Sequence, residues 1–198
     1  TYMLVKAGGQ VPMKADGYLP IIKQTAEGQI MYKVNSADVQ ASQLKGKSIK
    51  DFQDALDEIS DNERKTLVGT EVVAYASPEG GEKLNTKLSD KRAGTADKAW
   101  DKIVKGKDVT DPEVKSMGQD WEGFQELVQN SNIEDKDLIL RVLSMYSDPA
   151  VRESEIKNMS SVYTELKSDI LPELRRARFI ANVEFKNYTA DELIKLVD

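Results

Sequence analysis

The chain has 198 residues, of which 39% are hydrophobic and 31% are charged, a composition typical of a globular domain that buries a core. Its formal net charge is −6, and the 28 basic and 34 acidic residues are mixed along the sequence, which argues against a nucleic-acid partner. The absence of cysteine and histidine excludes disulfides, Cys/His zinc sites, cysteine nucleophiles and Ser-His-Asp triads. No stretch reaches the roughly 20 apolar residues of a membrane span, so none is expected in this chain.

The first part of the chain indicates strands followed by a helix. Residues 1–27 combine short apolar runs with glycine and proline, which predicts a β-rich N-terminal extension. Residues 29–39 alternate between apolar and polar side chains, a period of two that predicts a strand. Ser48 is the expected N-cap of the helix that follows, because apolar residues recur at helical spacing after it.

The middle of the chain alternates between strand and helix. Residues 66–76 are apolar on both faces and predict a central strand, and a long helix is expected from about residue 82 to residue 105. Residues 112–121 indicate a short strand. A helical insertion is then predicted over about 120–170, with prolines marking helix boundaries.

The last strand is predicted at 176–185, where apolar residues alternate again. Residues 188–198 indicate the start of a C-terminal helix that the end of the sequence cuts off. The order is therefore β-α-β-α-β, a helical insertion, and a final strand. This order predicts the α+β class, with helices on one face of a mixed sheet.

An arginine stands out within the long helix. On a helical wheel starting at Leu84, Arg92 lies at about 80° and Asn85 at about 100°, both inside the apolar arc. A buried charge needs a partner, so one interpretation is that Arg92 reaches the sheet edge or pairs with a core carboxylate such as Glu71 or Glu184. The other is that Arg92 and Asn85 point into a cleft beside the preceding loop, where a guanidinium and free backbone N–H groups would bind a carboxylate or phosphate.

Residues 85–93 (NTKLSDKRA) match every fixed position of N-x-x-L-S-x-x-R-A, a motif of the OmpA-like, peptidoglycan-associated domain family. The preceding turn, residues 74–77 (AYAS), resembles the family's turn after its strand, and the predicted last strand loosely resembles its R-R-x-E-I strand. The resemblance extends over residues 28–187. It implies a two-layer sandwich of the βαβαββ type, here with residues 1–27 and the insertion added.

The resemblance implies a non-catalytic domain in the periplasm that grips the diaminopimelate-containing stem peptide of peptidoglycan. Such domains tether the outer membrane to the cell wall, through a lipoprotein anchor or another part outside this chain. In the family, an aspartate in the turn takes the diaminopimelate ammonium and the helix arginine takes its carboxylate. Here Arg92 matches the arginine, and Ser77, which carries no charge, stands at the aspartate position. The expected ligand-binding residues are Ser77, Asn85, Leu88, Arg92 and Arg176.

The replacement of the aspartate by Ser77 leaves a second hypothesis open. In it, the chain has kept the fold, has lost peptidoglycan binding, and serves as a scaffold or interaction module for other envelope proteins. Neither hypothesis includes a catalytic residue, a cofactor or a metal. The Asp-rich stretches lack the ligand spacing of a calcium loop, and no carboxylate pair stands out as an acid and base.

Overall fold

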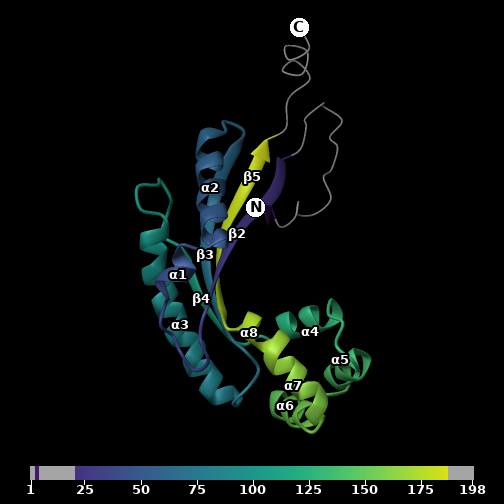
Figure 1. The fold of residues 1–198 in the computed structure, drawn as a ribbon. Coiled ribbons are helices and arrows are strands. Elements are labelled where there is room, and N and C mark those ends of the chain that lie inside the picture. Colours follow the sequence, from purple (N-terminus) through teal and green to yellow (C-terminus); the bar gives the residue numbers. More distant parts are fainter. Residues whose placement is uncertain (1–2, 5–20, 187–198) are drawn as a thin grey trace, which may run out of the picture.

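A computed structural model of the chain describes residues 3–4 and 21–186 (Figure 1). These residues form an α+β structure in which helices cover one face of a sheet and a separate group of helices lies at its lower end. In chain order, the elements are β1 (Met3–Leu4), β2 (Ile21–Met31), α1 (Ala41–Leu44), α2 (Lys47–Asp61), β3 (Lys65–Ala76), α3 (Glu82–Ile103), β4 (Glu113–Gln119), α4 (Trp121–Gln129), α5 (Lys136–Met145), α6 (Pro149–Lys157), α7 (Ser160–Asp169), α8 (Leu171–Leu174) and β5 (Arg176–Lys186).

The strands of the described residues form one mixed sheet in the order β1-β2-β5-β3-β4. The last strand, β5, is antiparallel to both of its neighbours, β2 and β3, while β3 and β4 are parallel. Helix α3 makes the crossover between the two parallel strands, as such a pair requires. The predicted α+β class and its two-layer arrangement on a mixed sheet are confirmed.

The main core lies between the sheet and helices α2 and α3. Alternate residues of β5, beginning with Ala177, are buried toward these helices, so the predicted period of two is confirmed. Three aromatic rings from α2, α3 and β5 meet at the centre, with centroids 6.0–6.5 Å apart, within the range of favourable ring pairs. Gly28 permits this contact, since a Cβ there would lie 2.7 Å from the Cβ of Phe52. The three rings belong to Phe52, Trp100 and Phe179.

The helices between β4 and β5 have a hydrophobic core of their own. Buried residues from α4 to α8 form a cluster separate from the main core. Figure 1 shows this group of helices at the lower right, away from α2 and α3. These helices, residues 121–174, form the insertion. Its largest fully buried side chains are Phe124, Ile139, Leu166, Leu174 and Val128.

Three local expectations are corrected by the structure. The first strand ends at Met31 instead of continuing through residue 39, because Asn35 has a φ of 54° and turns the chain away from the sheet. That strand starts at Ile21, so residues 21–27 belong to β2 and not to a separate extension. Ser48 is not an N-cap: Gly46 holds that position, and the Ser48 hydroxyl accepts a hydrogen bond from the Gln29 N–H at 2.9 Å.

The remaining residues of the predicted extension, 1–2 and 5–20, and the predicted C-terminal helix at 188–198 lie outside the described residues. Within the part of the chain that the structure describes, no helix is long and apolar enough to span a membrane.

Candidate functional site

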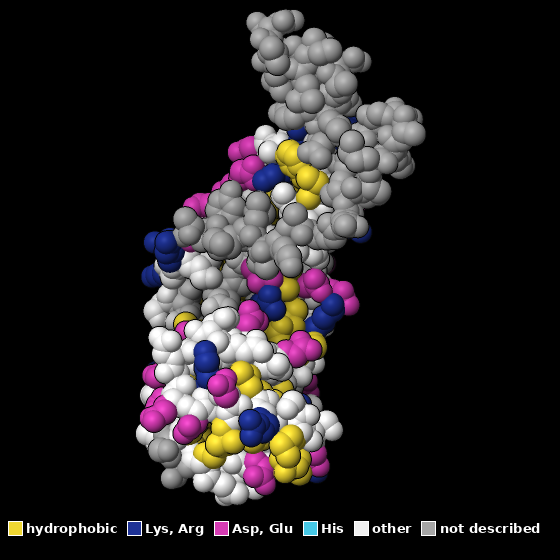
Figure 2. Space-filling model, turned by 90° about the vertical axis from the view of Figure 1, so that its right-hand side faces the viewer, with side chains coloured by type: hydrophobic (Ala, Val, Ile, Leu, Met, Phe, Trp, Pro, Cys, Tyr) yellow, Lys and Arg dark blue, Asp and Glu magenta, His cyan; other side chains and the backbone are white. Residues whose placement is uncertain are grey.

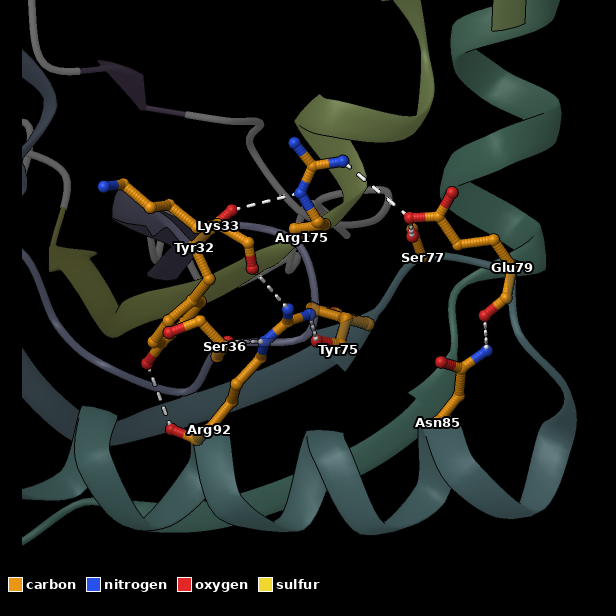
Figure 3. Close-up of polar contacts among 9 residues, drawn as sticks. All are labelled: Tyr32, Lys33, Ser36, Tyr75, Ser77, Glu79, Asn85, Arg92 and Arg175. Carbon is orange, nitrogen blue, oxygen red and sulfur yellow. Dashed lines mark hydrogen bonds and ion pairs between the residues drawn. The ribbon is translucent and has the colours of Figure 1, made fainter. Parts of the chain in front are cut away.

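The arginine that interrupts the apolar face of α3 is completely buried. Arg92 has 0% relative exposure. Its guanidinium donates three hydrogen bonds to backbone carbonyls: Nε to Ser36 at 2.9 Å, Nη1 to Tyr75 at 3.1 Å and Nη2 to Lys33 at 3.2 Å (Figure 3). The carbonyls come from the loop after β2 and from the end of β3. Arg92 therefore ties this loop to the sheet.

The environment of Arg92 is suited to hold a charge without a carboxylate. The guanidinium carbon lies 5.0 Å from the centre of the Tyr32 ring, a cation–π distance, and the Tyr32 hydroxyl donates to the Arg92 carbonyl at 3.2 Å. Burial lowers the pKa of Arg92 to about 10, so the side chain remains protonated at neutral pH. Carbonyl dipoles and an aromatic face take the place of a counterion.

The expected pairing of Arg92 with a core carboxylate is wrong. Glu71 lies on the opposite face of the sheet, where its carboxylate accepts from Lys115 at 2.5 Å and from Asn182 at 3.1 Å. Alternation along β3 places Val72 and Ala74 toward the helices and Glu71 away from them. Glu184 is one of the β5 residues that alternate with the buried ones, so it also lies on this outer face of the sheet. The strand register therefore separates both carboxylates from Arg92.

The loop before α3 joins two of the predicted site residues through Glu79. The Asn85 amide nitrogen donates to the Glu79 carbonyl at 2.5 Å, and the Ser77 hydroxyl donates to the Glu79 carboxylate at 2.9 Å (Figure 3). Gly80 and Gly81 have φ values of 83° and 92°, a region that glycine enters without strain. Asn85 and Ser77 thus close this loop internally.

A second arginine lies between this loop and the one that Arg92 holds. Arg175 donates from Nε to the Tyr32 carbonyl at 3.1 Å, and its Nη1 lies 3.8 Å from the Glu79 carboxylate. Glu79 therefore places a negative charge beside Ser77, the position in the turn where the resemblance implies an aspartate, and Arg175 lies close to the same carboxylate. Sequence reasoning did not find the role of Arg175.

The five predicted site residues do not form one site. Ser77 and Asn85 meet at Glu79, and Arg92 lies further along α3 beneath the carbonyl of Tyr75. Leu88 is half-buried on α3. Arg176 lies on the other face of the sheet, because alternation along β5 turns it away from α3 while its neighbour Ala177 faces the core.

Arg176 forms a partly buried ion pair with the N-cap of α4. Its Nη2 lies 3.0 Å from one carboxylate oxygen of Asp120, and the other oxygen accepts from the Gly123 N–H at 2.9 Å. Asp120 is 6% exposed. The Arg176 guanidinium also lies 5.2 Å from the centre of the Tyr75 ring. The sequence DWEG at 120–123 is explained by this arrangement, which sequence reasoning did not detect.

A cavity of about 290 Å³ opens beside this ion pair. It is lined by the C-terminal ends of β3 and β4, the start of β5 and the first turns of α4. Within the described residues, no group of acidic side chains is arranged to hold a metal ion. The cavity is lined by Tyr75, Met117, Gln119, Asp120, Trp121, Glu122, Gly123, Glu126, Arg176 and Arg178.

No protein-family model matches the sequence, and no curated protein matches it. Among solved structures, the chain is similar to the OmpA-like domain of FopA1 from Francisella tularensis subsp. tularensis SCHU S4. The two are 14% identical, the alignment covers 96% of this chain and 99% of that one, and the TM-score is 0.42. The α+β fold is defined by the strand pairing and the placement of the helices in this chain.

Proposed function

We propose that this chain is a non-catalytic scaffold and protein-interaction module of a bacterial cell envelope, in which Arg92 has become a structural clamp. The observation that carries the proposal is the burial of Arg92 and its three bonds to the carbonyls of Ser36, Tyr75 and Lys33. A ligand carboxylate at this guanidinium would have to displace these acceptors and enter the core. Each displaced carbonyl would be left buried without a donor, at a cost of about 1–3 kcal/mol.

The insertion gives further support, because it holds the loop that carries Ser77. The Gly80 N–H donates to the carboxylate of Glu153 on α6 at 2.9 Å. Pro78 lies at a small hollow lined also by Trp121, Phe124 and other apolar side chains of the insertion. The turn that resembles a ligand-binding turn is thus packed against protein, as the scaffold hypothesis expects.

The insertion also offers a surface for a protein partner. Leu138 and Met145 of α5 are 44% and 63% exposed. Figure 2 shows hydrophobic side chains grouped among charged ones over the lower end of the molecule, where the insertion lies. The motif at 85–93 supports an envelope location, on the periplasmic side of an outer membrane. In this proposal residues 21–186 form one unit whose insertion meets other envelope proteins.

Binding of the stem peptide is the second candidate function, and one observation favours it. The Glu79 carboxylate lies beside Ser77 and is a candidate acceptor for the diaminopimelate ammonium. It stays second because Arg175 lies 3.8 Å from the same carboxylate and Arg92 has no free face.

Calorimetric titration with a sugar-free stem peptide that contains diaminopimelate tests the two candidates. The scaffold proposal expects no heat above that of dilution. Saturable heat that is lost in Glu79→Gln, and kept in the control Glu82→Gln, would overturn it in favour of the second candidate. Glu82 is a suitable control because it is an exposed acid on the first turn of α3.

A further inference from the structure

Two residues that line the cavity beside Asp120 carry buried side-chain donors that lack acceptors. Among the described residues, three buried side-chain polar atoms have no partner, and two of them, Gln119 Nε2 and Arg176 Nε, belong to residues that line this cavity. A buried unpaired donor costs about 1–3 kcal/mol and calls for an explanation. Their concentration at one cavity distinguishes it from the other hollows of the described surface.

Two further donors belong to residues that line the cavity. Nη2 of Arg176 is bonded to Asp120, whereas Nη1 has no partner within the described residues. The Tyr75 hydroxyl accepts from Arg178 at 3.3 Å, and no acceptor for its own proton is found in the described part of the chain. The inner wall therefore presents donors to whatever occupies the cavity.

The rim of the cavity presents acceptors and apolar surface. Glu122 and Glu126 are exposed on one side of α4, and neither carboxylate has a partner among the described residues. Met117 is 56% exposed, and Trp121 is partly exposed at the start of the helix. The rim thus combines acceptors with a thioether and an indole ring.

The charges lining the cavity do not favour a simple ion. Both guanidiniums are already paired, Arg176 with Asp120 and Arg178 with Glu27, while Glu122 and Glu126 add negative charge. A bare anion would meet this negative charge, and a bare cation would leave the inner donors without acceptors. The occupant that suits both walls is neutral and carries neighbouring groups that donate and accept hydrogen bonds.

We propose that this cavity binds a neutral sugar residue. Each sugar hydroxyl both donates and accepts, so one ring can accept from Arg176 and Tyr75 while it donates to Glu122 and Glu126. The apolar face of the ring can pack against Trp121, as aromatic side chains combine packing area with polar edges. A volume of about 290 Å³ is at the lower end of ligand pockets, which fits one ring of a longer glycan or a monosaccharide.

The polar wall is held in place before a ligand arrives. Asp120 fixes Arg176 and caps α4 at the same time, so the guanidinium and the first turn of the helix keep one relative position. Arg178 is held by Glu27 and in turn positions the Tyr75 hydroxyl. A donor set that is ordered in advance loses little freedom on binding.

Tryptophan fluorescence gives a direct test, with N-acetylglucosamine and glucose as the probes and lysine, a net cation at neutral pH, as a charged comparison. The chain has two tryptophans, and Trp100 is 1% exposed, so a change on titration reports on Trp121. We expect saturation by at least one sugar, with a Kd of roughly millimolar size, and none by lysine. Tyr75→Phe should weaken binding about five- to tenfold, the effect of one lost hydrogen bond.

The matched control is Tyr163→Phe, which removes a tyrosine hydroxyl from α7 outside the cavity and should leave the Kd unchanged. Glu122→Gln, on the exposed rim, is a second test that does not touch the core. Absence of saturation with both sugars, saturation by lysine alone, or equal binding in all three variants would overturn the proposal. The inference is independent of the proposed function, because the sugar-free peptide used there cannot report on this cavity.

Discussion

Arg92 and Arg176 lie on opposite faces of the same sheet and show two ways to bury a guanidinium. Arg92 is surrounded by carbonyls of its own chain and by the Tyr32 ring, with no exposed surface. Arg176 pairs with one carboxylate and keeps donors without acceptors beside a cavity. The arginine that matches the family's motif is thus enclosed by its own chain, while the arginine with spare donors lies outside that motif.

The largest expected effect on stability comes from removing the Arg92 side chain. Arg92→Ala leaves three carbonyls without their donor and opens a space in the core. We expect the free energy of unfolding to fall by about 3–5 kcal/mol. Urea unfolding followed by circular dichroism would measure the loss. A decrease below about 1 kcal/mol would show that the clamp is dispensable and that Arg92 is available for another role.

A smaller loss of stability is expected from Gly123→Ala, next to the ion pair of Asp120 with Arg176. The new Cβ would lie 2.8 Å from the carboxylate carbon of Asp120, so the N-cap and its ion pair must shift. We expect a loss of about 1–3 kcal/mol, the usual cost of overpacking. Thermal unfolding measures it.

The matched control for this substitution is Gly94→Ala in the middle of α3. A Cβ at Gly94 meets no atom within 4 Å, and alanine is the better helix former. This variant should gain about 0.5–1 kcal/mol. If both glycine substitutions changed stability equally, the close contact between Gly123 and Asp120 would not matter.

The smallest expected effect is a change in the pH dependence of stability. It concerns Glu71, which lies on the same sheet face as Arg176. Its hydrogen bonds from Lys115 and then Asn182 lower the pKa of the carboxyl below 4.5. A carboxyl with a lowered folded-state pKa contributes stability above its unfolded value and loses it as the pH falls through the folded value. Thermal unfolding between pH 7 and pH 3 should therefore show a weaker acid dependence for Glu71→Gln. An identical slope in both proteins would contradict this.

Much of the fold could be predicted from periodicity. The strand at β3, the helix α3 and the alternation of β5 follow from apolar spacing, which depends on neighbours in the sequence. The end of β2 could not be predicted, because the alternation continues past Met31 through Tyr32 and Val34. Tyr32 is buried against Arg92, whereas Val34 is 58% exposed, so a turn at Asn35 replaces the strand.

The candidate site was harder to predict than the fold. The position of Arg92 on the apolar face was correctly identified, but its partners are backbone carbonyls, which no side-chain pattern reveals. Asp120 carried a local signal, since aspartate is a preferred N-cap residue at the start of a helix. The ion pair of Asp120 with Arg176 joins positions 56 residues apart and had no such signal.

The sequence by itself determined the α+β class, the apolar faces of α3 and β5, and the presence of a charge within the core. These are consequences of local spacing, since each residue's face follows from the helix or strand that contains it. The tertiary structure was needed to show that Arg92 is enclosed by its own chain and that Arg176 borders a cavity. That outcome depends on strand register and on the loop after β2, which bring carbonyls to Arg92 and turn Arg176 toward Asp120 on the opposite face.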